Sequence, residues 1–205
     1  MSSYVEIVLQ RNRGWPWPED SWGLSPMFGE DGWCRSCGVP KHPQSGSIVL
    51  QKRGLTVEGG WVPNWQFDVY CLARDLANGA ADRFGLELRP VASAAGPSLP
   101  AGQIIIASSR AAWFDPRDLT RLISPIHGVA FETCQECGTT RWLPVGMDVL
   151  PMPPTEVVVE EPPVIASPER FGAGKQSFRQ ILWRRDVAEF LAAASPKDFQ
   201  IQDSA

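Results

Sequence analysis

The sequence predicts an α+β protein, because three stretches share one order of elements: a short apolar strand, an amphipathic helix and a second strand. These strand–helix–strand units cover residues 69–91, 104–133 and 178–203. Their spacing is irregular, so we expect amphipathic helices lying on sheet faces and not a repeat array. Residues 92–102, rich in Gly, Pro and Ser, are predicted to form a loop between the first two units.

Each expected helix begins near an Arg-Asp pair. The pairs are Arg74-Asp75, Arg117-Asp118 and Arg185-Asp186. An aspartate at a helix start can accept hydrogen bonds from free backbone N–H groups and complements the positive end of the helix dipole. The apolar residues that follow fall on one face of the second and third helices. They are Leu119, Leu122 and Ile123, then Val187, Phe190, Leu191 and Ala194.

The composition is that of a globular protein, with 43% hydrophobic and 20% charged residues. A net charge of −4 and a pI near 5.2 favour neither nucleic acid nor an anionic membrane as a partner. No apolar run approaches the ~20 residues of a membrane span, and residues 1–14 lack the pattern of a signal peptide. A cytoplasmic, reducing location is predicted, where closely spaced cysteines are more often metal ligands than disulfides.

Two matched C-x-x-C-G motifs, here called the knuckles, are the strongest chemical signal. They read CRSCG at 34–38 and CQECG at 134–138. The spacing places both sulfurs on one side of a tight turn, which the glycine can close with a positive φ. Four thiolates are the number that a closed structural zinc site requires. We therefore predict one structural zinc ion in a zinc-ribbon-like site, bound by Cys34, Cys37, Cys134 and Cys137.

Other interpretations of the cysteines are two independent knuckles, two disulfides or a redox C-x-x-C pair. Redox use is disfavoured because nothing before either motif resembles the strand of a thioredoxin-type unit. Cys71 lies in an apolar run and is interpreted as a buried small hydrophobic residue. His42 is expected in an exposed loop, and His127 has no acidic partner that the sequence identifies. Since a fully coordinated zinc has no open position for water, we expect no enzyme.

The expected organisation has three parts. Residues 1–150 form the knuckle-bearing domain, with residues 38–133 as an insertion that returns the chain to the first knuckle. Residues 151–168 contain six prolines and three glutamates with no basic residue, which is typical of an extended linker with a short strand at 156–159, or of an acidic docking ribbon. Residues 169–205 are predicted to be a C-terminal strand–helix–strand unit that packs on the main domain.

Four of the nine tryptophans lie near the start of the chain, spaced by Pro and Gly. They are Trp15, Trp17, Trp22 and Trp33. One interpretation is that they form an irregular apolar cover over the first knuckle. The other is a partner surface, because Trp and Arg are enriched among the residues that dominate interface energies. On that interpretation the expected partner-binding residues are Trp15, Trp17 and Trp22.

The two knuckles and the terminal stretch QILWRRDVAEFLAAASPKDFQI at 180–201 resemble the double-CXXCG proteins, first noticed as a myxobacterial paralogous family. The matching residues are Cys34, Cys37 and Gly38 with Cys134, Cys137 and Gly138. Some members of that family are immunity proteins paired with toxins exchanged between cells. The resemblance implies a cytosolic, zinc-stabilised protein that occludes a cognate toxin sterically and has no turnover.

Two further classes of binding protein compete with this interpretation. One is a zinc-ribbon nucleic-acid or transcription-associated protein, with Arg35, Lys41 and Arg141 near the knuckles as its best contacts. The other is a structural subunit of a larger assembly, in which zinc only joins the two knuckles. The sequence does not identify the toxin, the partner surface or the oligomeric state.

Overall fold

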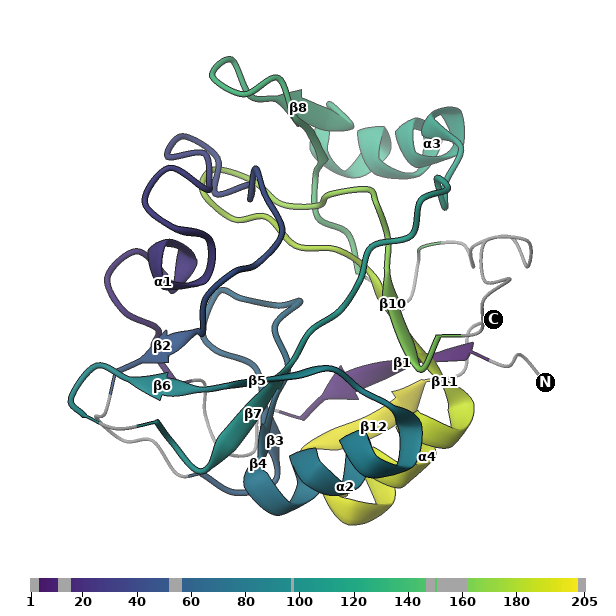
Figure 1. Ribbon diagram of the computed structural model, residues 1–205. Coiled ribbons are helices and arrows are strands. Elements are labelled where there is room, and N and C mark those ends of the chain that lie inside the picture. The colour runs from purple at the N-terminus through teal and green to yellow at the C-terminus, as the bar shows by residue number, and fades with distance from the viewer. Residues whose placement is uncertain are drawn as a thin grey trace.

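The computed structural model describes residues 4–10, 16–51, 57–96, 98–146, 150 and 162–202. Helices and several small sheets are mixed along the chain, which confirms the predicted α+β class (Figure 1). No helix within the described ranges has the length and apolarity needed to cross a membrane.

The first sheet joins the two ends of the described chain. Its strand order is β10-β11-β1-β12, and every neighbouring pair is antiparallel. The strands are β1 (Tyr4–Leu9), β10 (Val164–Ala166), β11 (Ile181–Arg184) and β12 (Phe199–Gln202). Thus β1 lies between the two strands that flank helix α4 (Arg185–Ala194), with Val5 opposite Trp183 and Ile7 opposite Ile201.

The second sheet has the same local arrangement around helix α2 (Arg74–Phe84). Its order is β3-β4-β7-β5, so β7 (Ala101–Ile104) lies between the two strands that flank the helix. Its other strands are β3 (Gly60–Trp61), β4 (Cys71–Ala73) and β5 (Leu88–Pro90). In both sheets, therefore, a helix links two strands that are separated by a third, antiparallel strand.

Helices α2 and α4 pack side by side and join the two sheets (Figure 1). The Phe84 and Phe190 rings meet edge to face, with centroids 5.4 Å apart. Beneath them, one apolar core is shared by both sheets and includes the fully buried Trp183 and Leu191. Burial of this shared surface holds the two sheets together. The predicted units 69–91 and 178–203 are thus found as β4–α2–β5 and β11–α4–β12, each with its helix starting at the Arg-Asp pair.

The middle predicted unit, 104–133, does not form in this way. Helix α3 (Pro116–His127) starts after a long loop, with the Asp115 carboxylate accepting the Arg117 N–H at 2.8 Å. Strand β8 (Phe131–Thr133) then pairs with β9 (Thr140–Trp142) and not with β7. Helix α3 packs on a separate apolar core, because its buried residues Leu119 and Ile123 meet Phe171 and Leu182 instead of the α2 and α4 region.

The remaining elements surround the first knuckle. Helix α1 (Leu24–Phe28) precedes it, and a two-stranded parallel sheet of β2 (Val49–Leu50) and β6 (Ala92–Ser93) follows. Of the range 151–168, expected as a linker, residues 151–161 lie outside the described residues, as does the short strand expected at 156–159. The later residues 164–166 are the strand β10 of the first sheet.

Candidate metal centre

The four knuckle cysteines meet at one point, although about a hundred residues separate the knuckles. Their four sulfurs all lie within 4.8 Å of one another. The Cys34 and Cys134 sulfurs are 3.8 Å apart, and those of Cys37 and Cys137 are 3.5 Å apart. Disulfide sulfurs would lie about 2.05 Å apart, whereas four sulfurs at about 2.3 Å from a tetrahedral zinc lie about 3.8 Å from one another. The four cysteines are free thiols in a geometry compatible with one structural metal ion.

Both knuckles adopt the same turn. In each, the first cysteine's N–H donates to the carbonyl of the residue after the glycine, and the glycine N–H donates to the first cysteine's carbonyl. The N···O distances are 2.8 Å for Cys34 to Val39, 2.8 Å for Gly38 to Cys34, 3.0 Å for Cys134 to Thr139 and 2.8 Å for Gly138 to Cys134. Gly38 and Gly138 have φ of +74° and +71°, as the sequence predicts for the residue that closes each turn.

The knuckles also touch each other outside the sulfur cluster. The Ser36 hydroxyl of the first donates to the Glu136 carboxylate of the second. These two residues occupy the same position within C-x-x-C-G, as do the paired sulfurs of Cys34 with Cys134 and of Cys37 with Cys137. Equivalent positions of the two knuckles therefore meet, an arrangement that is compatible with two matching half-sites for one ion.

Burial and hydrogen bonding divide the thiols into two kinds. Burial raises the pKa of the Cys34 and Cys37 thiols. Burial acts in the same direction on Cys137, but its hydrogen bonds with the side chain and backbone of Thr139 outweigh burial and, with the Cys37 and Cys134 thiols, lower the Cys137 pKa to about 6. Because buried thiols ionise at a cost, a cation among them is needed to hold all four as thiolates. With four thiolates as ligands, such an ion has no open position for water.

A third chain segment, residues 172–177 between β10 and β11, supports the first knuckle. A Cβ atom added at Gly38 would lie 2.2 Å from the Lys175 carbonyl oxygen, so the two backbones pass in direct contact. The Arg141 guanidinium, from β9, ties this segment to the knuckle. Its Nη1 donates to the carbonyls of Gly174 at 2.6 Å, Gln176 at 2.9 Å and Cys37 at 3.3 Å.

This placement changes the interpretation of Arg141. The sequence offers Arg141 as a nucleic-acid contact, but its side chain is only 4% exposed and its second amino group lies 3.5 Å from the Glu132 carboxylate. A buried guanidinium that binds three backbone carbonyls is not available to a phosphate backbone. Arg35 pairs with Glu30 at 2.5 Å and stacks over Trp33 at 4.1 Å, and Lys41 is exposed.

Replacement of Arg141 by Met is expected to lower the free energy of unfolding by about 3 kcal/mol, because the variant leaves two carbonyls of the supporting segment and the Cys37 carbonyl without their charged donor. The measurement is denaturant unfolding of the metal-loaded protein. Arg35→Met, at an exposed position beside the same knuckle, is the matched control and should cost less than about 1 kcal/mol. Equal losses in the two variants would contradict the supporting role of Arg141.

The tryptophans near the start of the chain divide between core and surface. Trp15 lies outside the described residues. Trp33 is buried, and its indole N–H donates to the Ser25 hydroxyl at 3.2 Å, so it belongs to the apolar cover beside the first knuckle. Trp17 is 54% exposed, and Trp22 is half-buried.

Trp22 lines a hollow beside the first knuckle together with Trp65, a residue that sequence reasoning missed. This tryptophan hollow has a volume of about 340 Å³ and is lined by Trp22, Gly38, Trp65, Gln66, Lys175 and Ser177 among others. Trp65 is 50% exposed. Its isolated position in the sequence, in the turn 63–66, offered no pattern that could link it with Trp22.

The backbone of both tryptophans is unusual. Among the described residues, Trp22 and Trp65 are the only non-glycine residues with positive φ, at 55° and 66°. A bulky residue in this region is held at a cost, and such residues concentrate at functional sites. The Gln66 amide donates to the Trp22 carbonyl at 2.8 Å, and the Lys175 ammonium lies 5.6 Å from the Trp22 ring centroid. One connected surface is therefore formed by the turn 63–66, the two tryptophans and the supporting segment 172–177.

The remaining candidate residues occupy the places expected of them. Cys71 is fully buried, and burial raises the pKa of its thiol. His42 is exposed in the loop after the first knuckle. His127 ends α3, and its Nε2 lies 2.9 Å from the Pro144 carbonyl oxygen. None of the three is part of the sulfur cluster. No known family model and no curated protein matches this chain.

Proposed function

We propose that this chain is a zinc-stabilised protein-binding protein of the double-CXXCG type, which acts in the cytoplasm as an immunity protein against a cognate bacterial toxin. The observation that carries the proposal is the closed cluster of four sulfurs directly beside the tryptophan hollow. Four thiolates favour zinc among the common metal ions. Such an ion would hold the two distant knuckles in fixed positions and perform no chemistry itself.

The proposed mechanism is steric occlusion. The zinc fixes the first knuckle against the second, and Arg141 fixes residues 172–177 against the first knuckle. Trp22 and Lys175 then present a rigid aromatic and cationic wall to a partner, and Trp65 lines the same hollow. A rigid aromatic surface loses little conformational freedom on binding, and Trp is enriched among the residues that dominate interface energies. Trp17, exposed on the neighbouring stretch, stays a proposed contact as well.

Replacement of both Trp22 and Trp65 by Ala is expected to abolish protection by this chain against the toxin encoded beside its gene, because the variant loses both aromatic walls of the hollow. The measurements are growth of cells that co-express the two genes, and the dissociation constant of the purified complex. We expect the complex to weaken at least about 100-fold, since a hot-spot residue contributes about 2 kcal/mol or more. Zinc content should stay at one per chain.

Phe131→Ala is the matched control, because Phe131 is an aromatic residue of similar exposure, 47%, that does not line the hollow. It should leave protection intact. Protection that survives loss of both tryptophans would contradict this binding surface. A purified chain that forms no complex with the neighbouring toxin, and binds single-stranded or duplex nucleic acid in a salt-sensitive manner, would contradict the proposed function.

A further inference from the structure

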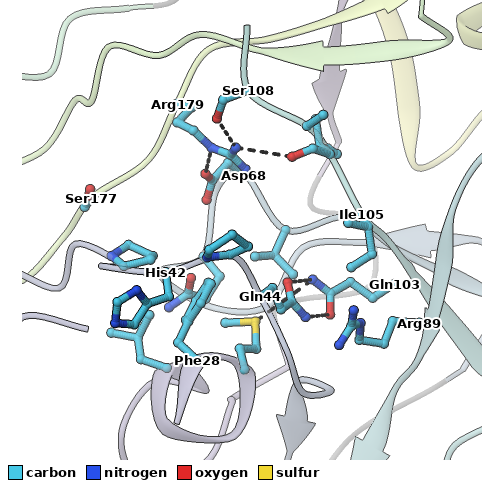
Figure 2. Close-up of a pocket in the computed structure, with 18 of the residues that line it drawn as sticks. Phe28, His42, Gln44, Asp68, Arg89, Gln103, Ile105, Ser108, Ser177 and Arg179 are labelled. Atoms are coloured by element: carbon cyan, nitrogen blue, oxygen red, sulfur yellow. Dashed lines mark hydrogen bonds and ion pairs between the residues drawn. The ribbon is translucent and has the colours of Figure 1, made fainter. Parts of the chain in front are cut away.

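A second and larger cavity adjoins the tryptophan hollow, since Leu24, Gly38, Gln66 and Ser177 line both spaces. It has a volume of about 620 Å³, within the range of pockets that hold small-molecule ligands. Its walls come from α1, the loop after the first knuckle, β5 and β7 (Figure 2). We call it the polar cavity; it is lined by Phe28, Gln44, Asp68, Arg89, Gln103 and Arg170 among others.

The charges that line the polar cavity are unbalanced. Four cationic side chains face two carboxylates: Lys41, Arg89, Arg170 and Arg179 against Asp68 and Glu87. Asp68 is already engaged, because the Arg179 Nε donates to its carboxylate at 2.7 Å, and both side chains are largely buried. Arg179 is fixed further by the Ser108 hydroxyl at 2.8 Å and the Ile106 carbonyl at 3.2 Å (Figure 2). This ion pair accounts for one cation and one carboxylate, which leaves Lys41, Arg89 and Arg170 against Glu87, although the Asp68 charge also acts on Arg170.

Among the described residues, none is a hydrogen-bond or salt-bridge partner of these three cations. Within the described ranges, the side chains of Lys41, Arg89 and Arg170 form no hydrogen bond and no ion pair. Arg170 is partly buried, and burial lowers the pKa of its guanidinium to about 10, so it stays charged at neutral pH. A partly desolvated guanidinium without a hydrogen-bond partner is costly. In a chain with a net charge of −4, this local excess of positive charge is a feature that an anion would complete.

The rest of the lining suits an organic ligand more than a bare ion. The side-chain amides of Gln44 and Gln103 donate to each other, with both N···O distances at 2.9 Å. This pair is fixed, since Gln103 is only 2% exposed. Figure 2 shows Arg89 close to the Gln103 amide, with Phe28 and His42 along another side of the cavity. The cavity therefore combines free cations, a rigid amide pair and an aromatic wall.

We propose that the polar cavity binds a small organic anion that carries phosphate or carboxylate groups, with Arg89 and Arg170 as the anion-binding side chains. The guanidinium fork binds either group through two parallel hydrogen bonds. The Gln44–Gln103 pair and the Phe28 ring then contact the body of the ligand. This site is separate from the sulfur cluster and does not rest on the proposed immunity function.

The test is titration calorimetry of the metal-loaded protein at low salt with three probes: pyrophosphate, citrate and ADP. We expect at least one to bind with 1:1 stoichiometry and a sub-millimolar Kd. Pyrophosphate or ADP as the tighter ligand assigns the site to phosphates, and citrate as the tighter ligand assigns it to carboxylates. If ADP binds more tightly than pyrophosphate, the organic part of the ligand contacts the aromatic wall of the cavity.

Arg89→Gln should weaken binding at least about tenfold, the effect of losing about 1.4 kcal/mol from a charge-assisted hydrogen bond. Arg170→Gln should do the same; if this variant fails to fold, the charge reversal Arg89→Glu decides in its place. Arg121→Gln is the matched control, because that arginine is 79% exposed on α3 and does not line the cavity. Absence of binding by all three probes, or binding that the Arg89 variants leave unchanged, overturns the proposal.

Discussion

Replacement of Cys134 by Ser is expected to release the metal ion from both knuckles, and not to leave it on the first. The four sulfurs form one cluster, and either knuckle alone offers half a tetrahedral shell. Structural zinc sites contribute about 10 kcal/mol or more in small peptides. Here the apolar cores stay intact, so we expect a loss of about 5 kcal/mol and a melting temperature lower by about 10 °C or more. Metal analysis and thermal unfolding measure the two effects.

Cys71→Ala is the matched control, because it removes a fully buried cysteine that lies outside the cluster. It should keep one metal ion per chain. Removal of the metal by a chelator should lower the melting temperature of the wild-type protein and leave that of Cys134→Ser unchanged. Two metal ions per chain, or a disulfide within one knuckle, would contradict the shared site.

The second large effect is an asymmetry between two glycines in equivalent positions. Gly38→Ala is expected to destabilise the protein by roughly 3 kcal/mol or more, whereas Gly138→Ala should cost about 1–2 kcal/mol. Both glycines have φ above +70°, so both variants carry the same backbone strain. Only at Gly38 would the added Cβ meet another segment, the Lys175 carbonyl at 2.2 Å; at Gly138 nothing lies within 4 Å.

Denaturant unfolding of the two metal-loaded variants measures this difference, and each variant is the other's control. The Gly38 variant should also lose the order of residues 172–177, which hydrogen exchange of the Gln176 N–H would report, because that group donates to Ala173 in the wild-type turn. Equal destabilisation at the two positions would mean that residues 172–177 do not support the first knuckle.

The sulfur cluster was predictable from the sequence because its signal is local. Each C-x-x-C-G motif defines its own turn, and two matching half-sites imply that they meet. The support of the cluster was not predictable in the same way. From the sequence, Arg141 is interpreted as a surface cation beside the second knuckle. Only the fold shows that its guanidinium binds the carbonyls of a segment more than thirty residues away. Trp65 carried no signal for the same reason.

The fold shows the same division between local and distant information. The Arg-Asp pairs correctly placed the starts of α2 and α4, and the strand–helix–strand order correctly placed a strand on either side of each helix. The sequence could not show that a third strand lies between the two strands of each unit, because these third strands, β1 and β7, come from other parts of the chain. In residues 104–133 the predicted helix forms, but the strands before and after it belong to different sheets. The partner of a strand depends on contacts with other segments, which periodicity does not encode.

The position of β1 between β11 and β12 determines when the first sheet can form during synthesis. β1 ends at Leu9 and β11 begins at Ile181, so the ribosome must add about 170 residues before β1 gains a neighbour. At 5–20 residues per second this takes roughly 10 to 30 s. The second knuckle emerges earlier, at Cys137, so metal capture can close the middle of the protein first. During that interval the apolar β1 has no strand to pair with, which makes the nascent chain a candidate client for chaperones that bind exposed strands.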